Sequence, residues 1–424
     1  MNRRSFLINS MMVSAGLALP GSRSVFAQGT PVVNEDVSGT VVYWSTYNTV
    51  SPEYQVLTEQ VIPGFNARYP NVEIKAQAIP DADMRQKLLT AAAGGETPDV
   101  ARMDIVQVPE FAEMGALAAI DDLIPDFASY AERFFQGPLA TNTFQGKHYG
   151  IPLDTNTRVI FYNPAVLEEA GVSEPPTTFD AFNDAAVKIA EAGKFAYSEG
   201  GTGAWNMLPW IWSNGGGITN EDYTQATGVL NGEGTVGAVE MIKGWLDNNQ
   251  MSEAVFGGGL STSQELAEGS VAMIVDGPWM PSIFKAQYPD FEFGLSQFPA
   301  GPGGSISVVG GENTVLFDAS QNKEAALAFA MYLADPEAQL AMATTGQMPV
   351  LSELKDSEDV PDYFPTFLTQ LDTAQPRTPS PAWPKIDEAV TAAIYQAITG
   401  ELDAQAALDE AAAAVDALLA KYQS

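Results

Sequence analysis

The chain has no cysteine and a single histidine, His148, among 424 residues. The absence of cysteine excludes disulfides, a thiolate nucleophile and a lipid-modified cysteine that would tether the protein to a membrane. One histidine without cysteine leaves no His/Cys metal cluster and no Ser-His-Asp arrangement with a recognisable nucleophile motif. We interpret His148, which follows Lys147 in a turn-like stretch, as structural. The sequence therefore predicts no metal, no cofactor and no enzymatic activity.

Basic residues are also scarce. The chain has 20 Lys and Arg against 53 Asp and Glu, a formal net charge of -33. A chain of this charge repels polyanions, so we expect no nucleic-acid partner. A solvated acidic surface, salt adaptation or a cationic ligand such as a polyamine would each account for the acidity. Paired carboxylates could cleave glycosides, but among 53 acidic residues some pair lies close by chance.

Long apolar runs are missing, and the apolar stretch 6–19 is too short and polar to span a membrane. Arg3-Arg4 followed by Ser5-Phe6-Leu7, with small residues before Gln28, resembles a twin-arginine export signal. A general secretory signal with a chance arginine pair is the alternative. We expect a signal peptide over residues 1–27, cleaved near Ala27, and a periplasmic protein with no membrane anchor.

The remaining chain of about 400 residues exceeds what one hydrophobic core usually serves, which favours two domains. Apolar residues alternate in 72–78, as in a half-buried strand, whereas Leu57, Val61 and Phe65 recur at the spacing of a helix. Alternating strands and helices predict an α/β protein built from βαβ units. We predict strands over 40–44, 72–78, 158–162, 271–275 and 291–295, and helices over 52–69, 82–93, 178–192 and 402–422.

Aromatic residues are abundant where turns meet expected strand ends. A tryptophan in a surface loop is costly unless it forms the wall of a site. Trp210, Trp212 and Trp245 are interpreted as packing residues, because they lie in an apolar run or on a helix face. The candidates for walls of a ligand site are Trp44, Tyr47, Trp205, Trp279 and Trp383.

The order of several short motifs resembles the extracellular solute-binding proteins of ABC importers, in the carbohydrate-binding group that is maltose-binding-protein-like. Each motif is weak alone, but their order and spacing are specific and extend over nearly the whole mature chain. The matching pieces are Val41-Val42-Tyr43-Trp44-Ser45, Thr97-Pro98-Asp99-Val100, Gly146 to Pro152, Phe161-Tyr162-Asn163, Gly269 to Met273, Asp276-Gly277-Pro278-Trp279, Gly310-Gly311, Asn322 to Ala326, Gly346 to Pro349, Pro376-Arg377 and Trp383.

The resemblance implies a periplasmic binding protein type II fold, in which two α/β lobes joined by a multi-strand hinge hold a ligand in the cleft between them. By analogy, lobe 1 comprises residues 38–150 plus 278–328, and lobe 2 comprises residues 151–277 plus 329–424. Because the chain crosses between the lobes more than once, we expect them to rotate as rigid bodies.

A sugar offers hydroxyls and apolar C–H faces, so its site needs flat aromatic surfaces and planar polar groups. The resemblance places Trp279 and Trp383 as stacking rings. Three of the polar candidates have an alternative to ligand contact: Asp104 as a helix cap, Arg377 as the partner of a surface acid, and Asp154 as a hinge residue. The resemblance implies further ligand contacts from Trp44, Ser45 and Tyr47 in the first lobe, from Trp205 and Asn206 in the second, from Asn48, Asp104, Asp154 and Arg377 to hydroxyls, and from the backbone of Gly310 and Gly311.

The implied function is binding a sugar or related polyol and delivering it to the transmembrane permease of an ABC importer. We expect a monomer with a small carbohydrate ligand. Two alternatives stay open, namely the same fold binding a polyamine or a glycerophosphate, and an exported carbohydrate-active enzyme.

Overall fold

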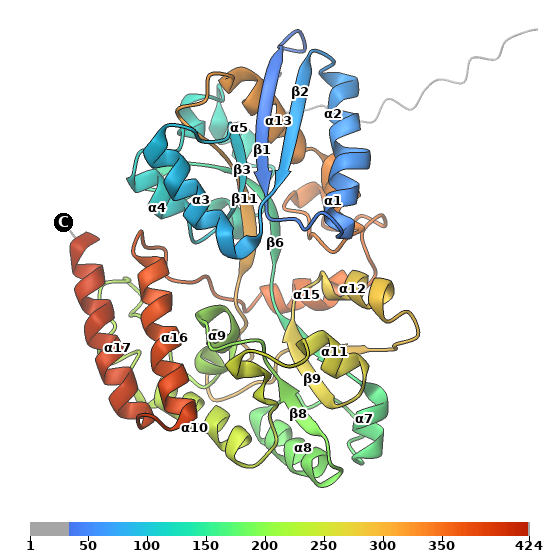
Figure 1. Cartoon of the computed structure of the whole chain (residues 1–424), viewed down its shortest axis with the longest axis vertical. Coiled ribbons are helices and arrows are strands. Elements are labelled where there is room, and N and C mark those ends of the chain that lie inside the picture. Colours follow the sequence, from blue (N-terminus) through green and yellow to red (C-terminus); the bar gives the residue numbers. More distant parts are fainter. Residues whose placement is uncertain (1–33, 423–424) are drawn as a thin grey trace, which may run out of the picture.

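The computed structural model describes residues 34–422, so the predicted signal peptide lies outside the described residues. Two lobes lie one above the other, and strand β6 runs between them near the centre (Figure 1). None of the helices in residues 34–422 is long and apolar enough to cross a membrane.

The first lobe is built on a five-stranded sheet with the order β2-β1-β3-β11-β6. β1 and β2 pair in parallel from Gly39↔Val72 to Ser45↔Ala78, and the alternating burial of β2 confirms the strand predicted over 72–78. β11 is antiparallel to both of its neighbours. The strands are β1 (Gly39–Ser45), β2 (Val72–Ala78), β3 (Val100–Asp104), β6 (Ile151–Asn156) and β11 (Gly310–Leu316), beside a hairpin of β4 (Thr143–Phe144) and β5 (Lys147–His148).

Helices cover both faces of this sheet. The helix predicted over 52–69 is observed as α1, one π-helical turn and α2, and Phe65 packs edge-on against Phe329 and Tyr332 of α13. The helices of this lobe are α1 (Pro52–Val56), α2 (Ile62–Arg68), α3 (Asp81–Gly94), α4 (Val108–Glu113), α5 (Phe127–Ala131), α6 (Gln136–Ala140), α13 (Lys323–Leu333) and α14 (Pro336–Ala343).

The second lobe is built on a four-stranded sheet with the order β10-β7-β9-β8. Its core centres on Trp210, whose ring lies 4.5–5.4 Å from those of Phe179, Phe182, Trp245 and Phe298. The elements are β7 (Val159–Tyr162), β8 (Phe195–Ser198), β9 (Val271–Asp276), β10 (Gly294–Ser296), α7 (Pro164–Glu169), α8 (Phe179–Glu191), α9 (Ala204–Ser213), α10 (Glu233–Asp247), α11 (Thr262–Ala267), α12 (Met280–Gln287), α15 (Phe364–Leu371), α16 (Trp383–Thr399) and α17 (Ala404–Leu419).

The chain passes between the lobes from β6 to β7, from β10 to β11 and from α14 to α15. These crossings are bonded to one another. The hydroxyl of Thr157 donates to the carbonyl of Val308 (2.8 Å), that of Ser307 donates to the carbonyl of Arg158 (2.7 Å), and the Thr155 N–H donates to the carbonyl of Met348 (3.1 Å). They form one hinge.

Strand pairing and packing differ from the expected lobe boundaries in three places. β6 lies in the first sheet, because its residues pair with β11. β10 and α12 lie on the second sheet, where Gly294 pairs with Tyr162 and the ring of Phe284 packs 6.0 Å from that of Phe161. α14 belongs to the core of the first lobe. We propose a revised division, with 34–156 plus 310–343 as the first lobe and 159–309 plus 364–422 as the second.

Candidate functional site

One edge of the first sheet faces the second lobe. It is formed by the carboxyl ends of β1, β3 and β6 and by the start of β11, and we name it the interlobe edge. Three carboxylates lie there in register, because Glu312 of β11 is opposite both Asp104 of β3 and Asp154 of β6. We name these three residues the acidic row. Directly opposed residues of an antiparallel pair lie close together on one face of a sheet.

Arg102 is the nearest counter-ion to the acidic row. Its Nη2 lies 2.7 Å from Glu312 Oε2 and 3.7 Å from Asp154 Oδ2, and its guanidinium stacks 4.5 Å from the ring of Tyr47. Only 3% of the Asp154 side chain is exposed. Burial raises the pKa of the Glu312 carboxyl well above its usual value. The positive charge of Arg102 lowers this pKa in part, whereas the neighbouring Asp154 raises it further. Glu312 therefore keeps its proton more readily than an exposed glutamate.

Arg377 joins the interlobe edge to the second lobe. It lies in the segment between α15 and α16, and its Nη2 donates to Asp104 Oδ1 at 3.0 Å. Its guanidinium lies 5.3 Å from the ring of Trp205. Asp104 Oδ1 also accepts from the Val106 N–H at 3.0 Å, which closes a local turn. The helix cap considered for Asp104 is not observed, because the N-cap of α4 is Gln107 and no side chain bonds that end of the helix.

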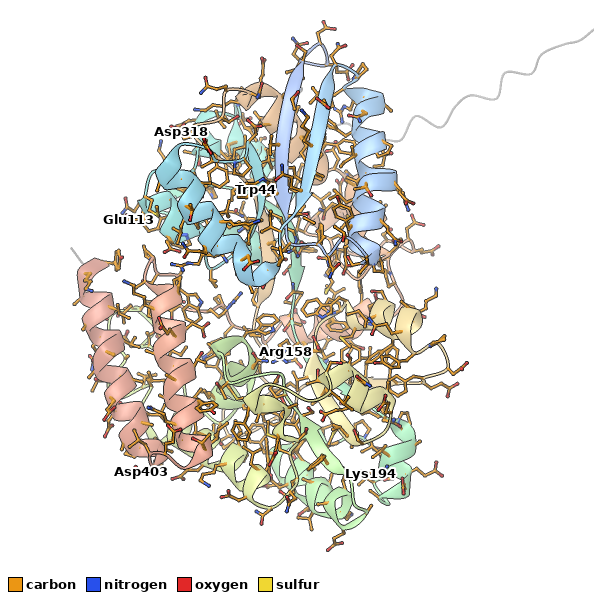
Figure 2. The ribbon with its side chains drawn as sticks, in the orientation of Figure 1. Trp44, Glu113, Arg158, Lys194, Asp318 and Asp403 are labelled. Atoms are coloured by element: carbon orange, nitrogen blue, oxygen red, sulfur yellow. The ribbon has the colours of Figure 1, made fainter. Side chains whose placement is uncertain are left out.

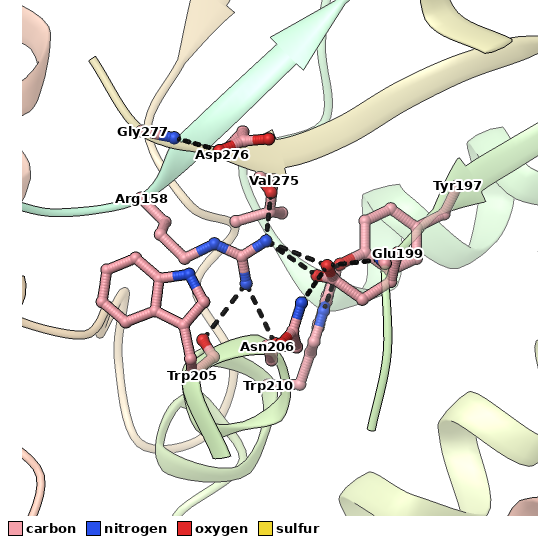
Figure 3. A network of polar contacts seen from close by, with 10 residues as sticks. Arg158, Tyr197, Glu199, Trp205, Asn206, Trp210, Val275, Asp276 and Gly277 are labelled. Atoms are coloured by element: carbon pink, nitrogen blue, oxygen red, sulfur yellow. Dashed lines mark hydrogen bonds and ion pairs between the residues drawn. The ribbon is translucent and has the colours of Figure 1, made fainter. Parts of the chain in front are cut away.

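Trp205 and Asn206 lie in the first turn of α9, and a polar network holds that turn (Figure 3). Arg158 Nη1 donates to the carbonyls of Trp205 (3.2 Å) and Asn206 (3.3 Å), while Nη2 donates to both oxygens of Glu199 at 3.0 Å. Glu199 also accepts from the hydroxyl of Tyr197 at 2.7 Å.

The two predicted glycines let the backbone of β11 approach its neighbours. A Cβ on Gly310 would lie 2.2 Å from Asn156 Oδ1 and 2.6 Å from Cη2 of Trp205, so the indole packs where a side chain would be. Gly311 has φ +131°, and a Cβ there would lie 2.4 Å from the Asp154 carbonyl oxygen. Larger residues would separate the strands or displace the ring.

Several buried polar atoms at the interlobe edge lack a hydrogen-bond partner in the described part of the chain. Buried polar groups are normally satisfied, so such a concentration marks a place where another molecule can bond. The atoms are Ser45 Oγ, Gln107 Oε1, Asn156 Oδ1, Arg377 Nε and both oxygens of Asp154.

The structure therefore brings most of the predicted residues together at the interlobe edge or directly beside it. These are Ser45, Tyr47, Asp104, Asp154, Trp205, Asn206, Gly310, Gly311 and Arg377. Sequence reasoning missed Arg102, Glu312, Arg158 and Glu199. The available signal was a charged residue inside an apolar strand, as in Val100-Ala101-Arg102-Met103.

Four predicted residues lie elsewhere. Trp44 packs with the hydrophobic cluster under α3 and α4, inside the upper lobe and away from Arg158 (Figure 2). Trp279 packs beside Phe284, and its ring covers Gly277. Trp383 is 2% exposed within the core of the second lobe, because the first turn of α16 is directed into that core. Asn48 is exposed and accepts from the Val50 N–H. For these four, as for the nine residues at the interlobe edge, ligand contact stays a prediction.

A groove of about 780 Å³ lies between the lobes, lined by α6 of the first and α15 of the second. Among the predicted residues, Arg377 lines it. In residues 34–422, no group of three or more His, Cys, Asp or Glu side chains is placed to hold a metal. His148 contacts Asp121 Oδ1 at 3.0 Å and the ring of Phe127 at 4.7 Å, which agrees with a structural role.

The two-lobed architecture with a hinge and a polar interlobe edge defines a binding protein of the periplasmic type. The chain belongs to the bacterial extracellular solute-binding proteins, whose family model matches residues 48–340. The prediction of this family is confirmed.

Among curated relatives, a binding protein of Brucella abortus (strain 2308) is 26% identical over 378 residues, covering 86% of this chain and 90% of the relative. The maltotriose-binding protein of Pyrococcus abyssi is 27% identical over 400 residues, covering 91% of this chain and 81% of the relative.

Among solved structures, the GacH receptor of Streptomyces glaucescens, determined unliganded and with acarbose, has a TM-score of 0.83 at 26% identity, covering 91% of this chain and all (100%) of that one. An ABC transporter solute-binding protein of Thermotoga lettingae bound to α-D-tagatose has a TM-score of 0.79 at 25% identity. The match covers 90% of this chain and 100% of that one. The predicted type II periplasmic binding protein fold is confirmed.

Proposed function

We propose that this protein is the exported substrate-binding component of an ABC importer and that it binds an uncharged sugar or related polyol between its lobes. The relatives named above that bind maltotriose, acarbose or tagatose support this substrate class. Residues 1–27 would direct export by the twin-arginine route to the periplasm. A transmembrane permease would receive the ligand from a monomeric carrier.

The unpartnered polar atoms at the interlobe edge, beside an aromatic ring, carry the proposal. Sugar hydroxyls both donate and accept, so they can satisfy amide, hydroxyl and carboxylate oxygens such as Asn156 Oδ1 and Ser45 Oγ. The indole of Trp205 offers an apolar face for C–H groups. A ligand contacting both lobes would stabilise the closed form, and about 5.5 kcal/mol of differential affinity moves such an equilibrium from mostly open to mostly closed.

The pairing of the arginines argues against an anionic ligand such as a glycerophosphate. Arg102 faces Glu312 and Asp154, Arg158 faces Glu199, and Arg377 faces Asp104. An anion would have to displace a carboxylate at each of these guanidinium groups. The same pairing partly neutralises the acidic row, which makes a neutral ligand a better fit than a polyamine.

Thermal shift and calorimetry with maltose, maltotriose, tagatose, spermidine and glycerol 3-phosphate test the proposal, because a ligand that binds the native state raises the melting temperature. We expect one or more neutral sugars to stabilise the protein and to be recovered unchanged. Trp205→Ala should weaken sugar binding at least tenfold.

The control is Tyr395→Ala, which removes an exposed aromatic residue from α16 and should leave affinity unchanged. Stabilisation by spermidine or glycerol 3-phosphate alone would overturn the sugar assignment. Cleavage of the sugar during incubation would favour a carbohydrate-active enzyme.

A further inference from the structure

The first turn of α9 contains a backbone carbonyl that its own helix cannot satisfy. In an α-helix, the carbonyl of residue i accepts from the N–H of residue i+4. The residue four positions after Trp205 is Pro209, which lies inside α9 and has no N–H. The carbonyl of Trp205 therefore needs a donor from outside the helix.

Arg158 supplies that donor. Its Nη1 lies 3.2 Å from the Trp205 carbonyl oxygen, and its guanidinium lies 5.6 Å from the centre of the Trp205 ring. We propose that Arg158 is a positioning residue that fixes the Trp205 indole for ligand binding by bonding the carbonyl that Pro209 leaves free. The inference rests on the proposed function, because it assigns Trp205 to the ligand.

Arg158 is held firmly enough to serve this role. Its side chain is 3% exposed, and Nη2 donates to Glu199 and to the carbonyl of Val275 at the end of β9 (Figure 3). Its own carbonyl accepts from Ser307 on the second crossing of the hinge. Arg158 lies at the centre of the molecule, between the lobes (Figure 2). The position of Trp205 is therefore tied to the hinge itself.

The indole also contacts groups linked to the first lobe. Gly310 of β11 has no side chain where the ring packs, and Arg377, 5.3 Å from the ring, bonds Asp104. Trp205 thus contacts one residue of the hinge and two groups whose positions depend on how the lobes are oriented. A displaced indole would lose these contacts together with its face toward a ligand.

The test pairs Arg158→Met with Glu199→Gln, so that Glu199 is not left as a buried carboxylate without its counter-ion. The seven tryptophans are labelled with 5-fluorotryptophan, and the Trp205 ¹⁹F resonance is assigned from Trp205→Phe. Without sugar, we expect this resonance to shift or broaden in the double variant. Maltotriose affinity, measured by calorimetry, should fall about tenfold.

Adding Pro209→Ala gives the Trp205 carbonyl a helical N–H donor and should recover part of both changes. Glu199→Gln alone keeps Arg158 and should leave the Trp205 resonance in place. An unchanged resonance in the double variant, or the full change in Glu199→Gln alone, would overturn the inference. If the wild type does not bind maltotriose, that sugar fails as a ligand, while the ligand-free ¹⁹F comparison still decides the role of Arg158.

Discussion

At the scale of single residues, the charged side chains of the interlobe region already have partners within the protein. Asp104 bonds Arg377 and Glu199 bonds Arg158, so neither arginine is free to capture an anion. A ligand must then bond the atoms that these pairs leave over, such as Asn156 Oδ1. Uncharged groups that both donate and accept suit those atoms best.

Asp276, the last residue of β9, gives a prediction for pH dependence. Burial raises the pKa of the Asp276 carboxyl to about 6 from 3.8. The charge of Glu199 also raises this pKa, whereas Arg158 and the hydrogen bond from the Gly277 N–H lower it. The folded state therefore binds the proton more tightly than the unfolded state, and this contribution to stability is lost as the pH rises from 4 through 6. Relative to wild type, Asp276→Asn should gain on the order of 2 kcal/mol in free energy of unfolding between pH 4 and pH 7.

The measurement is urea unfolding of both proteins across that pH range. Asn keeps the oxygen that accepts from the Gly277 N–H, so the comparison isolates the charge. A difference that stays constant with pH would contradict a raised pKa at Asp276.

At the scale of elements, β11 combines two adjacent glycines with different constraints. Gly311 has φ +131°, and a Cβ at this position would meet backbone atoms of β6. A Cβ at Gly310 would meet the side chains of Asn156 and Trp205. The first contact opposes strand pairing, and the second opposes the position of the indole. The same element therefore serves folding at one residue and the ligand site at the next.

We predict that Gly311→Ala lowers the free energy of unfolding by more than 2 kcal/mol, because neither the strand nor its φ can accommodate a side chain. Gly310→Ala should destabilise the fold less and weaken sugar affinity about tenfold through Trp205. Urea unfolding and calorimetry separate the two effects. Equal stability losses with unchanged affinity in Gly310→Ala would contradict this assignment.

At the scale of the whole molecule, three bonded crossings leave rotation about the hinge as the available motion between the lobes. The Asp104–Arg377 ion pair spans the lobes next to the hinge, and Arg377 is 8% exposed. A hydrogen bond between charged partners contributes about 1.5–3 kcal/mol, and screening by solvent at Asp104, whose side chain is 33% exposed, places this pair at the lower end of that range. This pair therefore favours the lobe arrangement of this structure even before a ligand binds.

Asp104→Asn should shift the ligand-free protein toward the open form by about tenfold, because it removes the charge from one partner. Small-angle scattering should record a larger radius of gyration than for wild type. The control is Asp247→Asn, which breaks an exposed ion pair with Lys243 within α10 and should leave the radius unchanged. An equal radius for Asp104→Asn and wild type would show that the pair does not hold the lobes together.

Local patterns predicted much of the fold. The alternation over 72–78 matched β2 residue for residue, and the helix predicted over 178–192 is observed as α8, with Thr178 as its N-cap. These patterns depend on neighbours within one element. The resemblance placed β10 and α12 in the first lobe, whereas β10 pairs with β7, and a pairing between strands more than 130 residues apart leaves no local pattern in the sequence.

The candidate site was predicted in part. Arg377 is part of a motif that resembles a known family, Asp104 and Asp154 follow within a few residues of two others, and the structure brings all three to one edge. A tryptophan at a turn, in contrast, can face a crevice or the core beneath it. Trp205 faces Gly310 and Arg377, whereas Trp383 enters the core, and no local pattern distinguishes the two.

The sequence by itself determined the alternation of strands and helices, the family, and the absence of thiols and of a His/Cys cluster, because these follow from composition and short-range spacing. Only the tertiary structure decided that Glu312 lies opposite Asp104 and Asp154, that Arg158 bonds the carbonyl freed by Pro209, and that the indole of Trp205 lies beside the interlobe edge whereas that of Trp383 is in the core. Those relations join residues up to about 200 positions apart, and strand register and lobe packing, rather than any local preference, bring them together.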